Sequence, residues 1–278
     1  MSKRQRLTIT LRDDILNKLD NTIDDHNVRN RSHAIERILS ENLGPKIKNA
    51  IILTNGKGVR MRPFTYEMPK CMIPVHDRPI LEYSLDILRD YGLKDVIIGV
   101  GYLGDKIKKH FQDGSRFGMR IIYNEEKRLL GNGGALGLAR GMTNETFFLI
   151  YGDVLADINL RNFVEFHKLH DGIVSMALNT AENTSDWGVV RLNGTRIVKI
   201  TEKPDKAMHL SGLINAGVFI VEPKIFDFIP ANKPIVLEKH VFPKLISEKK
   251  LYGYPFDGQW FDVSTPKIYE KVLKEWKK

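Results

Sequence analysis

From residue 49 onwards, the sequence alternates short, almost uninterrupted apolar runs with amphipathic segments. "NAIILT", "KDVIIGV" and "TFFLIYGD" are apolar runs of the kind typical of strands buried on both faces of a sheet. "PILEYSLDILRDYG", between the first two runs, places apolar residues at helical spacing and ends at a glycine. Strands that alternate with helices predict an α/β fold whose mostly parallel sheet is covered by helices on both faces. Ligands bind such sheets at the carboxyl ends of the strands, where residues 54–60 fall.

The first 45 residues follow a different pattern. "RLTITLR" alternates strictly, so that Leu7, Ile9 and Leu11 lie on one face of an expected strand and Arg6, Thr8 and Thr10 on the other. Two helical segments follow, "DDILNKLDNTIDDHN" and a second that we expect to begin at Ser32 as its N-cap and to end before Gly44 and Pro45. Because so small a unit cannot bury a core alone, we expect it to form an obligate dimer.

Residues 3–44 resemble a ribbon-helix-helix domain of the Arc and MetJ type, on the strength of "RLTITL" and "NRSHAIERIL". The resemblance implies that two chains pair their strands into an antiparallel ribbon, which enters the major groove of double-stranded DNA. Arg6, Thr8 and Thr10 would then face base edges, and the backbone amides near Ser32 would hold a phosphate. The alternative is that this module only dimerises the chain.

Charge and cysteine content limit the class of protein. The net charge of +9 permits an anionic partner, but the charge is not concentrated in one tract. The single cysteine, Cys71, excludes a disulfide framework. No apolar run reaches the length of a bilayer span, and "MSKRQR" does not lead into a signal-peptide core. We therefore expect a soluble, cytoplasmic protein with no membrane contact.

The stretch "ILTNGKGVRMRPFT", residues 52–65, is typical of a loop that holds phosphates, because it places glycines and cations directly after an expected strand. It is not a Walker A motif, since no Gly-Lys pair is followed by Ser or Thr at the required spacing. "GVGYLG", residues 99–104, matches a dinucleotide fingerprint only in isolation, so we interpret it as a turn.

Residues 50–88 resemble the signature of the sugar-1-phosphate nucleotidyltransferases, or NDP-sugar pyrophosphorylases. The likeness continues through "LLGNGGAL", "YGDV", "EKP", "INAGVFIVEP" and "WFDVSTPKIY", in the family's order. It is strongest to the mannose-1-phosphate guanylyltransferase branch, although glucose-1-phosphate thymidylyl- and uridylyltransferases share the pattern. It implies a Rossmann-like nucleotidyltransferase domain over residues 46–278, after a ribbon-helix-helix domain over residues 1–45. Its substrates would be a nucleoside triphosphate and a sugar-1-phosphate, and its products an NDP-sugar and pyrophosphate.

The resemblance also assigns roles to individual residues. Arg60 would hold the leaving pyrophosphate, and Lys70 would stabilise charge at the α-phosphate. Asp153 and Asp262 match the two metal-binding aspartates, and Mg²⁺ suits two carboxylates and a polyphosphate. The nucleotide would contact Thr54, Asn55, Gly56, Gly58, Asn132 and Gly133. The sugar phosphate would contact Glu202, Lys203, Asn215 and Gly217.

The sequence departs from the family pattern near the nucleoside. Asn55 replaces a glycine, Val59 a threonine, and Asn132 and Gly133 the usual Thr-Ala pair. Every charged residue that phosphates and metal require is present, so we expect a loop that still binds phosphates. One alternative is a transcription regulator that senses a sugar nucleotide through an impaired enzyme domain. His167 and His170, one helical turn apart, are interpreted as the surface of an amphipathic helix.

Overall fold

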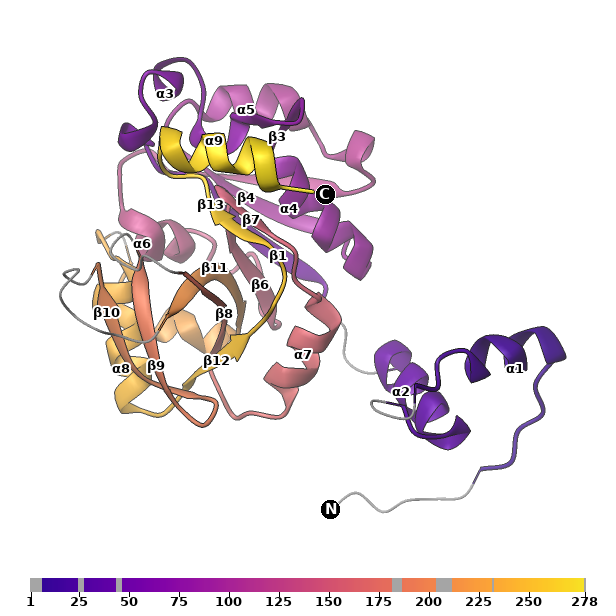
Figure 1. The fold of residues 1–278 in the computed structure, drawn as a ribbon. Helices are drawn as coiled ribbons and strands as arrows, with labels where there is room; N and C mark the ends of the chain where they lie inside the picture. Colours follow the sequence, from indigo (N-terminus) through magenta and orange to yellow (C-terminus); the bar gives the residue numbers. More distant parts are fainter. Residues whose placement is uncertain are drawn as a thin grey trace. The chain divides into compact units, whose positions relative to one another are not determined.

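The computed structural model describes residues 7–24, 28–43, 47–181, 187–203, 212–231 and 233–277. The chain divides into two compact units, Met1–Lys46 and Ile47–Lys278 (Figure 1). Among the described residues, no helix combines the length and the apolar character that spanning a bilayer would require.

The smaller unit contains two helices, α1 (Asp13–Asp20) and α2 (Arg31–Leu43). They pack through a small apolar cluster built around Leu19, Val28 and Ala34. Residues 7–12 form no strand in the single chain, which offers no second strand with which to pair. One expectation is wrong here. The cap of α2 is Asn30, not Ser32, since the helix begins at Arg31 and the Asn30 side chain accepts from the His33 N–H at 2.9 Å.

The larger unit is built on one twisted sheet. Nine of its described strands lie in the order β5-β4-β1-β6-β11-β8-β12-β10-β9. Their bounds are β1 Asn49–Leu53, β4 Asp95–Val100, β5 Arg120–Glu125, β6 Phe147–Tyr151, β8 Val174–Thr180, β9 Gly188–Asn193, β10 Arg196–Glu202, β11 Leu213–Val221 and β12 Leu251–Pro255.

The sheet is mixed, which corrects the expectation of a mostly parallel one. Strands β5, β4, β1 and β6 are parallel to one another, as the alternation of strands and helices predicts. Strand β11 runs antiparallel to both β6 and β8, and β10 runs antiparallel to β9 and β12. The reversal begins after β8, since β10 and β11 run opposite to the strands that precede them in the chain.

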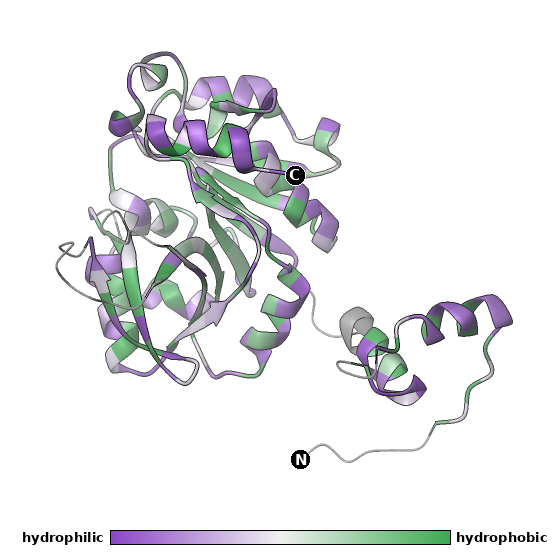
Figure 2. Ribbon diagram, viewed as in Figure 1, coloured by the Kyte–Doolittle hydropathy of each residue, from purple (hydrophilic) through white to green (hydrophobic). Residues whose placement is uncertain are grey.

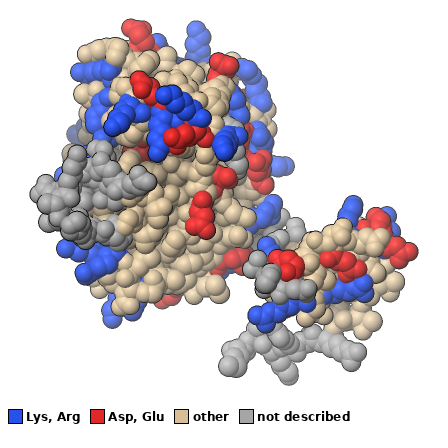
Figure 3. Space-filling view, viewed as in Figure 1, with Lys and Arg blue, Asp and Glu red and all other residues tan. Residues whose placement is uncertain are grey.

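Helices cover both faces of this sheet, because its buried strands are apolar on both sides (Figure 2). Ala50 and Ile52 of β1 belong to the core under α4 (Ile80–Tyr91), α5 (Gly104–Phe111) and α7 (Leu160–Lys168). Ile51 and Leu53 belong to the opposite core, under α6 (Gly131–Gly137) and α8 (Phe242–Ser247). On the visible face of the larger unit, blue and red side chains lie side by side in the upper part, above a broad area with few charged side chains (Figure 3).

Short elements connect this sheet to the C-terminal helix. Strands β7 (Val154–Ala156) and β13 (Trp260–Asp262) form a two-stranded ladder, and α9 (Pro266–Glu275) follows β13. A third core holds α9 against the segment that contains the turns η1 (Val59–Met61) and η2 (Lys70–Met72), the helix α3 (Phe64–Glu67) and the hairpin of β2 (Pro74–Val75) and β3 (Arg78–Pro79). The C-terminus is thus packed beside the expected phosphate loop.

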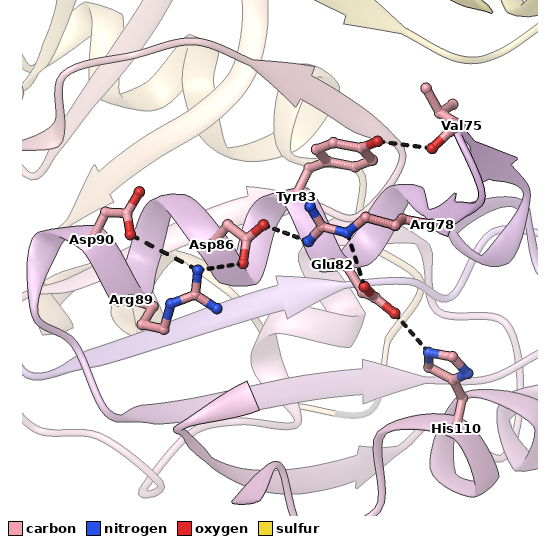
Figure 4. A network of polar contacts seen from close by, with 8 residues as sticks. All are labelled: Val75, Arg78, Glu82, Tyr83, Asp86, Arg89, Asp90 and His110. Carbon is pink, nitrogen blue, oxygen red and sulfur yellow. Dashed lines mark hydrogen bonds and ion pairs between the residues drawn. The ribbon is translucent and has the colours of Figure 1, made fainter. Parts of the chain in front are cut away.

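A polar network fastens the start of α4 (Figure 4). Arg78 donates to Glu82 at 3.2 Å and also pairs with Asp86, one turn further along the helix. The other oxygen of Glu82 lies 2.8 Å from Nε2 of His110, on α5. Tyr83 donates to the carbonyl oxygen of Val75 at 2.7 Å. These contacts fix the segment that follows Lys70 to two helices of the larger unit.

His167 is buried, which corrects the interpretation of both histidines as surface residues. Its side chain on α7 is only 7% exposed, and its Nδ1 lies 2.8 Å from the hydroxyl of Ser175 on β8. Its Nε2 lies 3.0 Å from a carboxylate oxygen of Glu222, which also accepts from Thr146. His170 is half-buried and contacts the hydroxyl of Thr195. The apolar face of α7 therefore includes one histidine, because two polar partners, Ser175 and Glu222, satisfy it.

Candidate active site

The site begins at the loop after β1. Gly58 adopts a positive φ of 59°, and a Cβ there would meet Cγ2 of Thr65 at 2.8 Å and Cβ of Lys70 at 3.2 Å. Thr65 in turn donates to the carbonyl oxygen of Gly58 at 2.8 Å. A glycine is required at residue 58 both for the backbone angle and for the close packing, and the resulting turn leads directly into Arg60.

Lys70 reaches two carboxylates that are distant in sequence. It forms an ion pair with Asp153, and its Nζ lies 4.0 Å from Oδ1 of Asp262. Burial lowers the pKa of Lys70, but the charges of Asp153 and Asp262 outweigh it and hold that pKa above its ordinary value. Lys70 is therefore a permanently charged group at the base of the site.

Two strands bring the two aspartates together. Asp153 directly precedes β7, and Asp262 ends β13, where it lies opposite Val154 in the antiparallel ladder. Burial and the neighbouring Asp153 raise the pKa of Asp262, while Lys70 and Trp187 oppose this shift. Trp187 donates from its indole nitrogen to Oδ2 of Asp262 at 3.0 Å.

The donor set at the two aspartates fits a hard divalent cation. Oδ1 of Asp262 is buried and, among the described residues, has no hydrogen-bond partner. A buried carboxylate oxygen is costly unless a positive charge satisfies it. Two carboxylates are too few to enclose a metal alone, and no cluster of three or more His, Cys, Asp or Glu side chains occurs in the described part of the chain. Two carboxylates would suit an ion whose remaining ligands are supplied by phosphates and water.

A cavity of about 360 Å³ opens above these residues. It combines charged groups of both signs with two indole rings, whose centroids lie 5.6 Å apart. The described residues that line it are Arg60, Lys70, Asn132, Tyr151, Asp153, Val154, Trp187, Gly188, Glu202, Lys203, Asn215, Ala216, Gly217, Glu238, Trp260 and Asp262.

Glu202 ends β10 and reaches the cavity because its neighbour is a glycine. Gly188 lies opposite it on β9, where a Cβ would come within 2.4 Å of Oε1 of Glu202. Burial raises the pKa of Glu202, and the charge of Glu238 adds to this shift. Lys203 follows with a positive φ of 43°, an uncommon backbone angle for a residue with a side chain. Such local strain is often concentrated at functional sites.

Asn215 and Gly217 shape the cavity wall through a break in β11. The pairing of β11 with β8 shifts register between Asn215 and Phe219, and Gly217 has a φ of 71°. The side chain of Asn215 accepts from the Gly217 N–H at 2.9 Å. Gly217 also packs closely on Tyr151, since a Cβ there would lie 3.1 Å from the Tyr151 ring.

The residues expected around the nucleoside are divided between two places. Asn132 lines the cavity, whereas Thr54, Asn55, Gly56, Gly58 and Gly133 do not. The Thr54 hydroxyl donates to the carbonyl oxygen of Gly99 at 2.7 Å. The Gly133 N–H donates to the carbonyl oxygen of Ile235 at 2.9 Å. The backbone at Gly56 faces open space, with no other group within 4 Å of a Cβ built there.

Sequence reasoning missed several residues of this region. Glu126, after β5, is 9% exposed, and its Oε2 is buried without a hydrogen-bond partner in the described residues. Burial raises its pKa. Tyr151 and Trp260 are the first residues of the quoted motifs "YGDV" and "WFDVSTPKIY", so their place in those motifs could have indicated them. Glu238 lies in "VLEKH", where no local pattern distinguishes it from a surface residue.

The DNA-contact residues named from the sequence belong to the smaller unit. Thr8, Thr10 and Ser32 are exposed, and Arg6 lies outside the described residues. Leu7 and Ile9, expected to face a dimer core, are 75% and 45% exposed in the single chain.

Comparison with known proteins shows the same division of the chain. The sequence model of the family described as "Nucleotidyl transferase" matches residues 49–278. A UTP–glucose-1-phosphate uridylyltransferase from Synechocystis is 34% identical over 241 residues, which cover 81% of this chain and 62% of that protein. The mannose-1-phosphate guanylyltransferase catalytic subunit beta of Drosophila melanogaster is 33% identical over 225 residues, which cover 79% of this chain and 60% of that protein. The chain thus spans about three fifths of the length of these curated relatives.

Solved structures share the fold. A structure of HddC from Yersinia pseudotuberculosis, complexed with GMP-PN, superposes with a TM-score of 0.71 at 22% identity, covering 83% of this chain and 100% of that one.

Proposed function

The chain belongs to the nucleotidyl transferase family, and from this premise we propose that it transfers a nucleotidyl group from a nucleoside triphosphate to a sugar-1-phosphate. The observation that carries the proposal is the single cavity that joins Arg60 and Lys70 to the paired aspartates and to Glu202. A triphosphate requires cations and a metal, and a sugar requires hydrogen-bond acceptors. This cavity offers cations and carboxylates for the triphosphate and its metal, and hydrogen-bond acceptors for the sugar.

In the proposed reaction, an oxygen of the sugar phosphate attacks the α-phosphorus of the nucleotide. The new P–O bond forms as the bond from the α-phosphorus to the bridging oxygen breaks, and pyrophosphate leaves with the electron pair. Arg60 holds the leaving pyrophosphate, and Lys70 neutralises charge at the α-phosphate. Asp153 and Asp262 would hold Mg²⁺, which supplies further neutralisation of the phosphates. Catalysis of this kind is mainly positioning and electrostatic stabilisation.

We place the nucleoside at the carboxyl ends of β1, β4 and β5, near the loop of Thr54, Asn55, Gly56 and Gly58. Asn55 and Glu126 each have a buried oxygen without a hydrogen-bond partner among the described residues, which favours a ligand with N–H groups. Guanine presents two adjacent N–H donors, so GTP is the first nucleotide to test. Gly133 supports this region by close packing.

The sugar phosphate occupies the part of the cavity lined by Glu202, Lys203, Asn215 and Gly217. Glu202 accepts hydrogen bonds from sugar hydroxyls, and Lys203 pairs with the sugar's phosphate group. The indole rings of Trp187 and Trp260 provide the apolar wall against which a sugar ring can pack.

The test is pyrophosphate release by the full-length protein with Mg²⁺, with GTP, TTP, UTP, CTP and ATP each tested against mannose-1-phosphate and glucose-1-phosphate. We expect turnover with at least one pair, and its loss in Asp153→Asn. Absence of turnover with every pair would refute the proposal. If calorimetry then detected binding of a sugar nucleotide, the alternative of a ligand-sensing regulator would be favoured.

For the smaller unit we propose a homodimer that binds double-stranded DNA. The exposure of Leu7 and Ile9, on either side of Thr8, supports a partner strand that covers the apolar side chains and leaves the polar ones outside. Arg6, Thr8 and Thr10 would then contact base edges, and the amides near Ser32 a phosphate.

Two measurements test this second proposal on the full chain. Light scattering should report a dimer or a higher homo-oligomer that dissociates in Leu7→Glu. Fluorescence anisotropy with a pool of duplex DNA should show binding that weakens in Thr8→Ala combined with Arg6→Ala. A dimer whose DNA affinity is unchanged by these substitutions would show that the unit only dimerises the chain.

A further inference from the structure

Three side chains from separate segments converge on one wall of the cavity. Glu238 lies in a single π-helical turn, η5 (Leu237–Val241), of a kind that is rare and frequently found at functional sites. One of its carboxylate oxygens accepts from the Tyr151 hydroxyl at 2.7 Å, and the other accepts from the Asn132 amide at 2.8 Å. All three residues line the cavity.

Asn132 acts as a clamp within this cluster. Its Oδ1 accepts from the Leu237 N–H at 2.9 Å, which fixes the orientation of the amide because a backbone N–H can only donate. Its Nδ2 donates to Glu238 and also to the hydroxyl of Tyr151, each at 2.8 Å. Both polar atoms of the Asn132 side chain are therefore engaged, Oδ1 with the Leu237 backbone and Nδ2 with Glu238 and Tyr151.

The carboxylate of Glu238 still has capacity for a ligand. Each carboxylate oxygen offers two lone-pair directions, and the contacts with Tyr151 and Asn132 use one on each oxygen. Burial and the charge of Glu238 raise the pKa of Tyr151 far above its ordinary value, so its phenol remains a donor to that carboxylate. The cluster thus presents fixed acceptor positions to the cavity.

The cavity contains two electrostatically distinct groups. Lys70 interacts with Asp153, Asp262 and Arg60. Glu202, in contrast, interacts with Glu238 and with two lysines, Lys203 and Lys239. A phosphate is attracted to the first group. In the second group, the paired carboxylates of Glu202 and Glu238 favour neutral hydrogen-bond donors, and Lys203 is the residue proposed to pair with the sugar's phosphate group.

We propose that Glu238, held by Asn132 and Tyr151, is a specificity-determining residue that accepts a hydrogen bond from one hydroxyl of the sugar ring. This inference rests on the proposed nucleotidyl transfer to a sugar-1-phosphate. Glu238 and Glu202 together give the pocket two carboxylates, so the preferred sugar carries hydroxyls that reach both residues. A sugar that lacks the hydroxyl facing Glu238 leaves that half-buried carboxylate with an unused acceptor inside the occupied pocket, which is a basis for rejecting the analogue.

The test compares wild type with Glu238→Gln and Tyr151→Phe, using the sugar-1-phosphate that the substrate panel identifies and its monodeoxy analogues. We expect wild type to discriminate against one analogue by at least about 100-fold in kcat/KM. Glu238→Gln should raise the KM for the parent sugar phosphate by about 10-fold or more and reduce that discrimination, with the KM for the nucleotide changed less than about twofold. Tyr151→Phe removes one donor to Glu238. It should also reduce the discrimination in kcat/KM against that analogue, by a smaller factor than Glu238→Gln does.

Other results would overturn the assignment. In Glu238→Gln, kcat/KM could fall equally with the parent sugar phosphate and with every analogue, or only the KM for the nucleotide could rise. Either result would mean that the cluster only supports the fold. Unchanged kinetics in Glu238→Gln would exclude contact with the sugar. Absence of turnover by wild type across the panel would refute the proposed nucleotidyl transfer itself, a result distinguishable because it precedes any variant.

Discussion

The backbone N–H of Val263 donates to the carbonyl oxygen of Asp153 at 3.1 Å. This bond extends the β7–β13 ladder by one step and sets Asp262 beside Asp153, although more than a hundred residues separate them in the chain. The geometry of the candidate metal site therefore depends on the docking of β13, and so on the packing of α9 behind it.

Asp262→Asn should abolish metal-dependent turnover while leaving the fold intact. Asparagine keeps the size of the side chain and can still accept from Trp187, but it removes the charge that faces the metal. We expect kcat/KM to fall by about 100-fold or more, measured as pyrophosphate release over a Mg²⁺ titration. A variant with wild-type activity and wild-type metal dependence would contradict the assignment of Asp262.

Gly58→Ala should impair the phosphate loop. The new Cβ would combine a left-handed backbone angle with contacts to Thr65 and Lys70 that are too short. We expect a loss of about 1–2 kcal/mol in the free energy of unfolding and a lower kcat/KM. Gly194→Ala is the matched control, because Gly194 has the same φ of 59° but no atom near its Cβ position and lies in a remote hairpin. Equal effects of the two substitutions would mean that backbone strain alone is responsible.

Gly188→Ala should separate substrate binding from stability. Its Cβ would displace the carboxylate of Glu202, which is the mobile end of a flexible side chain, so the fold can adjust. We expect the KM for the sugar phosphate to rise by about 10-fold, with a Tm close to that of wild type. Steady-state kinetics and a thermal melt check this together. A fall in Tm without a change in KM would show that Glu202 does not contact the sugar.

The buried His167–Glu222 contact should make stability depend on pH on the acid side. The hydrogen bond from His167 holds the pKa of Glu222 below its ordinary value of 4.5, despite partial burial. A depressed carboxyl pKa adds stability above the ordinary pKa, and that stability is lost as the pH falls through the lower, folded value. Glu222→Gln should therefore be less stable than wild type by about 1 kcal/mol at pH 7. This difference should shrink below pH 4.5.

Denaturant unfolding of both proteins between pH 3 and pH 7 measures that difference. A gap that stays constant with pH would show that the contact does not involve a charged Glu222.

Much of the architecture follows from local patterns in the sequence. Apolar runs predicted β1, β4 and β6, helical spacing predicted α4, and Gly92 marks its C-terminus with a φ of 100°. These features are local, because helix caps, buried strands and tight turns are set by residues within a few positions of one another. The expected phosphate loop belongs to the same class, since its turn requires a glycine at residue 58.

Only the tertiary structure decided the rest. The direction of β11 relative to β6 depends on how the chain returns to the sheet, and an apolar run carries no sign of that direction. His167 is buried because Ser175 and Glu222 satisfy it from other elements, which helical periodicity cannot reveal. Glu238 joins Asn132 and Tyr151 through contacts that span about a hundred residues. The sequence by itself determined the local elements and those charged residues of the site that lie in the quoted motifs. Which of those residues meet was decided by long-range packing, because side-chain contacts between distant segments leave no periodic signal in the chain.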